Sequence, residues 1–177
     1  MTPITPLPAE FAFLAGLAGE PTLERAQALT RTSKDVAPLR SWLAEQRRRT
    51  VRGLLTSKAA DRATLAETMG VAKQTVTVVS CAKPREVELP GRFAALAHLA
   101  GEPTLEQAAE VTRTALAARP LLAWLRDERQ RTVRALLDGP YDRAEIGTAL
   151  GVSVQRVSDI AAGHRGPWAR GQARGGS

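Results

Sequence analysis

Apolar residues in the segment 62–81 recur at the spacing of two short helices that meet at a turn. Leu65 and Met69 lie four positions apart, so they share one face of a first helix. Val76 and Val79 lie three positions apart and form an apolar stripe on a second helix. The segment therefore predicts two helices that pack against each other at a steep angle.

The segment 143–162 repeats this pattern, with Ile146 and Leu150 in the places of the two apolar residues of the first helix. A glycine stands at the turn in both segments, as Gly70 and as Gly151, where the backbone needs a positive φ. A single match is also compatible with an ordinary helical hairpin in a core. Two matches in one chain, each after a basic helix, favour a functional motif.

The residue runs LAETMGVAKQTVTVV and IGTALGVSVQRVSDI closely resemble the helix-turn-helix of bacterial DNA-binding proteins. The likeness is greatest to the family that includes region 4 of the major bacterial sigma factors, in which a long arginine-bearing helix also precedes the motif. The resemblance covers about 20 residues in each copy and is looser over the preceding helix. It implies a protein that places the second helix of each motif in the major groove of duplex DNA.

The repetition extends beyond these motifs. LAGEPTLE occurs at 17–24 and again at 99–106, and roughly 25 of 42 positions are identical between 14–55 and 96–137. We interpret this as an internal duplication of a five-helix unit. The expected fold class is all-α, with two homologous multi-helix domains that each end in a helix-turn-helix.

Breaks in the pattern predict the boundaries of these domains. The expected order is a flexible leader at 1–8, a first repeat at 9–82 with its helix-turn-helix at 62–81, a linker at 83–90, a second repeat at 91–162 with its helix-turn-helix at 143–162, and a basic Gly/Arg-rich tail at 163–177. We expect the tail to be disordered when free. Within the first repeat, Thr32 or Ser33 is expected to cap a new helix that has Pro38 in its first turn.

The chain carries a formal net charge of +7, which favours a polyanionic partner such as double-stranded DNA. The first repeat has eleven basic and seven acidic residues, whereas the second has nine of each. We therefore expect the first repeat to bind DNA more strongly. Because no run of 18 apolar residues occurs, we expect no membrane span. We expect a cytoplasmic protein that is associated with the nucleoid through its binding to DNA.

The resemblance also implies which side chains contact bases, at the outward positions near the start of each second helix. These positions hold Lys73, Gln74, Thr75 and Thr77 in the first repeat, and Ser153, Gln155, Arg156 and Ser158 in the second. Glutamine can pair with adenine, arginine can pair with guanine, and hydroxyls can reach phosphate or thymine. The alternative for each residue is a solvated helix face. The chain departs from the family pattern at Val78 and at Asp159. The carboxylate of Asp159 would repel a nearby phosphate, although it could accept a hydrogen bond from N4 of cytosine.

Arginines on the preceding helices and in the tail are candidates for phosphate contacts. They are Arg47, Arg49, Arg52, Arg62, Arg129, Arg131, Arg134, Arg143, Arg165 and Arg170. Part of this charge is expected to be neutralised on the helix surface, because Glu45–Arg49 and Asp127–Arg131 are spaced as i,i+4 ion pairs. The remaining arginines would either clamp phosphates or form a solvated face.

Enzyme signals are weak. The two histidines, His98 and His164, do not accompany a recognisable nucleophile or metal-binding motif. The single cysteine, Cys81, excludes an intramolecular disulfide, and we expect it to be a small buried residue. The alternative is an intermolecular disulfide or a redox switch. We therefore expect no enzymatic activity, no cofactor and no metal site.

These observations together predict a DNA-binding transcriptional regulator with two recognition helices in one chain, which makes a monomer a pseudo-dimer. Recognition helices about 34 Å apart would meet successive major grooves. One alternative is a nucleoid or architectural protein that binds DNA with little sequence preference. Others are a partner of RNA polymerase or of another regulator, and a helical scaffold.

Overall fold

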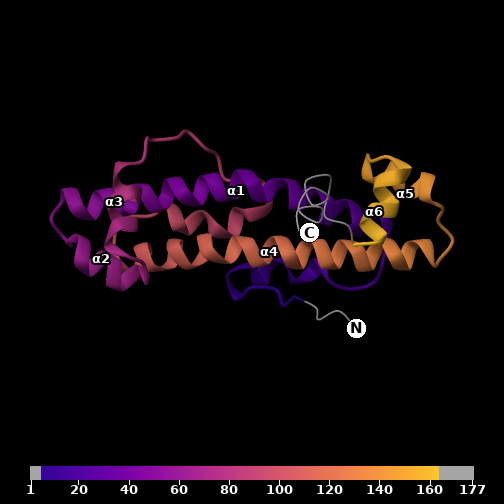
Figure 1. Ribbon diagram of the computed structural model, residues 1–177, viewed down its shortest axis with the longest axis horizontal. Helices are drawn as coiled ribbons and strands as arrows, with labels where there is room; N and C mark the ends of the chain where they lie inside the picture. Colours follow the sequence, from indigo (N-terminus) through magenta and orange to yellow (C-terminus); the bar gives the residue numbers. More distant parts are fainter. Residues whose placement is uncertain (1–4, 164–177) are drawn as a thin grey trace, which may run out of the picture. The chain divides into compact units, whose positions relative to one another are not determined.

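The computed structural model describes residues 5–163, and within them it contains eight helices and no strand, which confirms the all-α prediction. The elements are η1 (Ala9–Leu17), α1 (Leu23–Thr56), α2 (Arg62–Met69), α3 (Lys73–Cys81), η2 (Gly91–Ala100), α4 (Leu105–Leu137), α5 (Arg143–Leu150) and α6 (Val154–Ala161). Figure 1 labels α1 to α6. In this part of the chain, no helix is both long enough and apolar enough to cross a membrane.

Each predicted repeat contains one long helix where two were expected, so it has four helices and not five. Pro38 lies inside α1 and Pro120 inside α4. Thr32 and Ser33 do not cap a new helix, because their hydroxyls donate hydrogen bonds to the carbonyl oxygens four residues earlier, each at 2.8 Å. A proline removes only one helical hydrogen bond, and the apolar residues on both sides of it are buried, so the helix continues.

The chain forms two compact units that differ from the predicted repeats. Among the described residues, unit 1 comprises 5–7, 11–34 and 120–163, and unit 2 comprises 8–10 and 35–119. Each long helix therefore contributes one part to each unit. The predicted linker at 83–90 lies within unit 2 and does not separate the two units.

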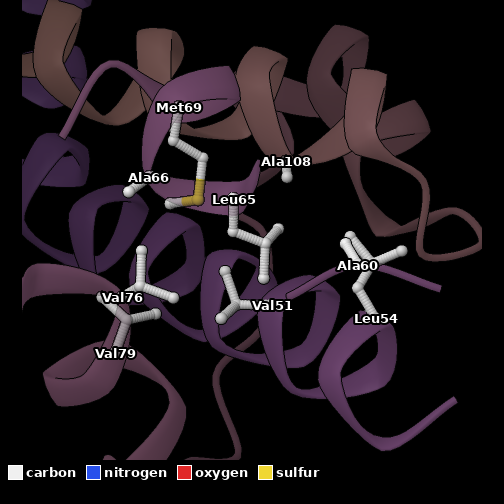
Figure 2. Packing of buried hydrophobic residues seen from close by; sticks show 9 residues of the cluster. All are labelled: Val51, Leu54, Ala60, Leu65, Ala66, Met69, Val76, Val79 and Ala108. Carbon is white, nitrogen blue, oxygen red and sulfur yellow. The ribbon is translucent and has the colours of Figure 1, made fainter. Parts of the chain in front are cut away.

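The core of unit 2 lies beneath α2 and α3 and includes a residue from the second repeat. Figure 2 shows its side chains, which come from four helices: Val51 and Leu54 of α1, Leu65, Ala66 and Met69 of α2, Val76 and Val79 of α3, and Ala108 of α4, together with Ala60. The small side chain of Ala108 is fully buried in this core. The first repeat alone does not supply this core.

The core of unit 1 shows the reciprocal arrangement. It contains Ala26 of α1, Val133 and Leu136 of α4, Ile146 and Leu150 of α5, and Val157 and Ile160 of α6. Ala26 and Ala108 occupy corresponding positions of the two repeats, 82 residues apart in the alignment of 14–55 with 96–137. The start of each long helix thus packs beneath the short helices that follow the other long helix.

Candidate functional site

The α2–α3 pair of unit 2 is built around a capped first helix and a tight turn. Asp61 caps α2, because its Oδ1 accepts a hydrogen bond from the backbone N–H of Thr64 at 2.8 Å. The positive φ predicted for Gly70 is confirmed, with φ 64° and ψ 35°. Just after it, the N–H of Val71 donates to the carbonyl oxygen of Ala66 at 2.9 Å. This left-handed residue turns the chain so that α3 starts shortly afterwards.

The α5–α6 pair of unit 1 repeats this local geometry. Asp142 and Glu145 cap α5 reciprocally, since each carboxylate accepts the backbone N–H of the other at 2.8 Å. Gly151 has φ 64° and ψ 41°, which again confirms the predicted positive φ. The two helix pairs therefore share a capped first helix, a left-handed glycine and a second helix held on the core by its apolar stripe.

The outward side of α3 presents polar groups to solvent. Lys73, Gln74 and Thr77 are exposed, and Thr75 is half-buried. Neither Lys73 nor Gln74 makes a side-chain hydrogen bond with another described residue, whereas the hydroxyl of Thr77 donates to a backbone carbonyl of its own helix. Val78 lies among them with 64% of its surface exposed. α3 itself contains no acidic residue, and the nearby carboxylate of Asp61 interacts with the charge of Lys73.

The corresponding residues of α6 make more hydrogen bonds within the protein than those of α3 do. Ser153 is the N-cap, and its Oγ accepts the backbone N–H of Arg156 at 3.2 Å. The amide Nε2 of Gln155 donates to Oδ1 of Asp159 at 3.3 Å. Ser158 is half-buried, and its hydroxyl donates to the carbonyl oxygen four residues earlier. Hydrogen bonds within the protein therefore hold more of the predicted base-contacting side chains in α6 than in α3.

Arg156 also lies close to a second cation, which its sequence position did not indicate. Its Nη1 and the Nε of Arg129 on α4 are both buried without a hydrogen-bond partner among the described residues. Burial, together with the charge of Arg156, lowers the pKa of the Arg129 guanidinium from its ordinary value. An arginine stays protonated at neutral pH in spite of such a shift, so two like charges lie near each other. An anion bound beside them would reduce this repulsion.

The basic cluster on α1 comprises Arg47, Arg48, Arg49 and Arg52, and Glu45 binds two of these arginines. Its carboxylate accepts hydrogen bonds from Arg48 at 2.7 and 2.8 Å and from Arg49 at 2.9 Å, so the predicted Glu45–Arg49 pair is present. The backbone N–H of Arg85 donates to it at 3.2 Å. These hydrogen bonds, led by the one from Arg48, hold the pKa of Glu45 at about 2 in spite of its burial. Arg48 is buried, although its neighbour Arg49 is exposed.

Arg52 is the arginine of this cluster that is left available. It is exposed and makes no hydrogen bond or ion pair with another described residue. It lines an open surface depression of about 430 Å³ together with Arg48, Arg49, Gly53, Thr56 and Pro84. Arg47 is half-buried, and burial lowers its pKa. Of the predicted phosphate contacts on α1, Arg52 and the exposed part of Arg49 are therefore the accessible ones.

The ion pairs among the charged residues of α4 differ from the predicted ones. The expected Asp127–Arg131 pair does not form, because Arg131 binds Glu128 at 3.1 Å. Asp127 instead accepts hydrogen bonds from Arg126 at 3.0 Å and from the hydroxyl of Thr5 at 2.7 Å. The aspartate side chain is one methylene shorter than glutamate, and its carboxylate is already occupied by these donors. Helix spacing alone does not reveal a partner as distant in sequence as Thr5.

The side chain of Arg134 is hydrogen-bonded to the end of α6. Its Nε donates to the carbonyl oxygen of Ala161, which also accepts Nε2 of Gln130 at 3.2 Å. Spacing gave no sign of this contact, because Arg134 and Ala161 are 27 residues apart. The other predicted phosphate contacts are Arg62 and Arg143, which are exposed at the first positions of α2 and α5, and Arg165 and Arg170, which lie outside the described residues.

The remaining candidate groups are the two histidines and the cysteine. His98 Nε2 lies 2.9 Å from Oε1 of Glu110, and this hydrogen bond raises the pKa of the exposed imidazole. Cys81 is exposed at the last position of α3, and the expectation that it is buried is wrong. Between residues 5 and 163, no cluster of His, Cys, Asp and Glu side chains could hold a metal ion. His164 lies outside this range.

A comparison of the chain with protein-family models, with curated proteins and with solved structures finds no match.

Proposed function

We propose that this chain binds duplex DNA as a transcriptional regulator and that α2–α3 and α5–α6 are helix-turn-helix motifs produced by an internal duplication. The observation that carries the proposal is the local geometry common to both pairs. Each has an aspartate cap, a glycine at φ 64°, and a second helix that buries two apolar residues while its first two residues are exposed. The net charge of +7 supports a polyanionic partner.

In this proposal, α3 enters the major groove and makes the principal base contacts. Gln74 would donate to N7 or accept from N6 of adenine through its unoccupied amide, and Lys73 would contact guanine. Arg52 and Arg62 would bind phosphates on either side of the groove and so fix the orientation of the helix. Both arginines are exposed and have no acidic partner among the described residues.

The α5–α6 pair has features that favour a second candidate function, namely contact with a protein such as RNA polymerase or another regulator. Val154 is 49% exposed at the start of α6, and Asp159 holds the amide of Gln155. An exposed apolar residue and a carboxylate on the same short helix suit a protein surface better than a phosphate backbone. We propose that unit 2 supplies most of the DNA affinity and that unit 1 adds either a weaker half-site or a protein contact.

The test is a selection of duplexes from a random library by the full chain at near-physiological salt. A triple variant, Lys73→Ala with Gln74→Ala and Thr77→Ala, removes the exposed polar groups of α3. Arg113→Ala, which removes an exposed charge of α4, is the matched control. An enriched motif that the triple variant loses and the control keeps would support the proposal.

The other outcomes separate the rival functions. Binding of the wild-type chain without an enriched motif would favour an architectural protein with little sequence preference. No binding to any duplex would overturn the proposal and favour a protein partner.

A further inference from the structure

Val78 has an exposure that the fold does not explain. Its neighbours on the same helix, Val76 and Val79, are buried in the core of unit 2, whereas 64% of Val78 is exposed. A single exposed apolar residue is ordinary on a protein surface. A β-branched residue, however, is a weaker helix former than alanine, so Val78 adds no helix propensity to α3, and most of its side chain lies outside the core.

Val78 lies beside Gln74 on α3. It follows Gln74 by four residues, so the two side chains are neighbours on the outward face of α3. Gln74 makes no hydrogen bond with another described residue, and α3 carries no acidic side chain. The face therefore pairs a free amide with an apolar group on a helix that does not repel phosphates. That combination complements an adenine–thymine pair, which offers N6 and N7 of adenine and the 5-methyl group of thymine in the major groove.

The corresponding position of α6 carries the opposite chemistry. Asp159 stands there, and its carboxylate accepts a hydrogen bond from Gln155, which corresponds to Gln74. A carboxylate cannot pack favourably on a methyl group. The chain thus contains its own comparison, with one helix suited to thymine and the other not.

We propose that Val78 is a specificity-determining residue that packs against the 5-methyl group of a thymine, so that the half-site of unit 2 contains an adenine–thymine pair contacted jointly by Gln74 and Val78. This inference rests on the proposed function, because it requires α3 to lie in the major groove. It adds the base pair that this helix selects and the group that it recognises.

The test exploits deoxyuridine, which differs from thymidine only in lacking the 5-methyl group. A duplex selected by the full wild-type chain is resynthesised with each thymine replaced in turn, and the dissociation constants are measured by fluorescence anisotropy. For one thymine we expect a loss of affinity of roughly fourfold, which corresponds to one buried methyl group. In Val78→Ala the same replacement should have no effect, and in the control Asp159→Ala the fourfold loss should persist.

The outcomes distinguish this inference from the function on which it rests. If the wild-type chain selects a motif but no uracil replacement weakens binding, or if Val78→Ala stays equally sensitive, the role of Val78 is overturned while DNA reading stands. If no duplex is selected, both fail. Loss of folding does not obscure the result, because alanine is the better helix former at this exposed position.

Discussion

Gln27 donates a hydrogen bond from Nε2 to the backbone carbonyl oxygen of Ala149, which lies 2.8 Å away and 122 residues later in the chain. The contact joins the start of α1 to the end of α5 within unit 1. Next to it, Ala26 is fully buried in the core beneath α5 and α6. The corresponding Ala108 is buried beneath α2 and α3. Each helix pair is therefore completed by residues from the other repeat.

Because each helix pair packs against residues of the other repeat, the stability of a fragment should depend on which residues it contains. The fragment 35–119 contains every residue of the unit 2 core, whereas the fragment 9–82 lacks Ala108 and Leu105. We expect 35–119 to melt cooperatively as a monomer, and 9–82 either to be unfolded or to dimerise, with Ala26 of each copy replacing Ala108. Circular dichroism melting and light scattering after size exclusion measure both properties. A monomeric 9–82 that melts as cooperatively as 35–119 would contradict this expectation.

Gly147 in α5 is predicted to be intolerant of a side chain. An added Cβ would lie 2.9 Å from the backbone carbonyl oxygen of Val152, in the turn that leads to α6. Relief would require a backbone shift, so we expect Gly147→Ala to lower the free energy of unfolding by about 1–3 kcal/mol. The control is Gly16→Ala, where no atom lies within 4 Å of the added group. Urea denaturation gives both values, and equal stability of the two variants would show that the turn adapts.

Glu45 should make the stability of the chain depend on pH in the acidic range. Its pKa is about 2 in the folded protein against an ordinary value of 4.5. A lowered folded-state pKa stabilises the fold above pH 4.5, and this contribution is lost as the pH falls towards 2. We expect Glu45→Gln to lower the unfolding free energy at pH 7 by about 1.5–3 kcal/mol, because hydrogen bonds to a charged group are lost.

The measurement for Glu45 is the unfolding free energy at pH 7 and at pH 3. The difference between the two pH values should be smaller in Glu45→Gln than in the wild type. Glu106→Gln, a change of the same kind at an exposed position of α4, should leave the difference unchanged. An undiminished difference in Glu45→Gln would assign the acid sensitivity to other carboxylates.

Arg52 and Arg134 occupy corresponding positions but should differ in their roles. Arg52 is exposed without a partner among the described residues, so we expect Arg52→Ala to weaken binding to all duplexes alike. It should reduce the slope of log K against log salt by about one unit. Arg134 donates to the carbonyl oxygen of Ala161, so Arg134→Ala should lower the unfolding free energy by about 0.5–1.5 kcal/mol. Salt titrations and denaturation separate the two effects, with Arg113→Ala as the control.

Gln74 and Gln155 provide a matched pair for base specificity. We expect Gln74→Ala to cost about 1–3 kcal/mol on the selected duplex and little on a scrambled one, because a bidentate contact with adenine is lost. Gln155→Ala should cost less, since the Gln155 amide already donates to Asp159. Competition binding with the two duplexes measures both losses. Equal losses on selected and scrambled DNA would place Gln74 outside the base-contacting face.

The sequence by itself determined the local structure of the two short-helix pairs. Gly70 and Gly151 could be assigned positive φ because only a residue without Cβ adopts it at no cost, and the turn needs it. The buried stripe of Val76 and Val79 followed in the same way from helical spacing. Such features depend on residues within one or two turns of each other, and a linear pattern contains that information.

Only the tertiary structure decided which parts of the chain pack together and which charges stay free. The two repeats are so similar that Ala26 and Ala108 fit either helix pair by pattern, and the choice between them is made by packing over the whole chain. The continuation of α1 through Pro38 has the same origin, since the burial of apolar residues on both sides outweighs one lost hydrogen bond. The burial of Arg48 and the engagement of Arg134 also depend on partners that three-dimensional packing brings into reach, and spacing along the chain does not encode them.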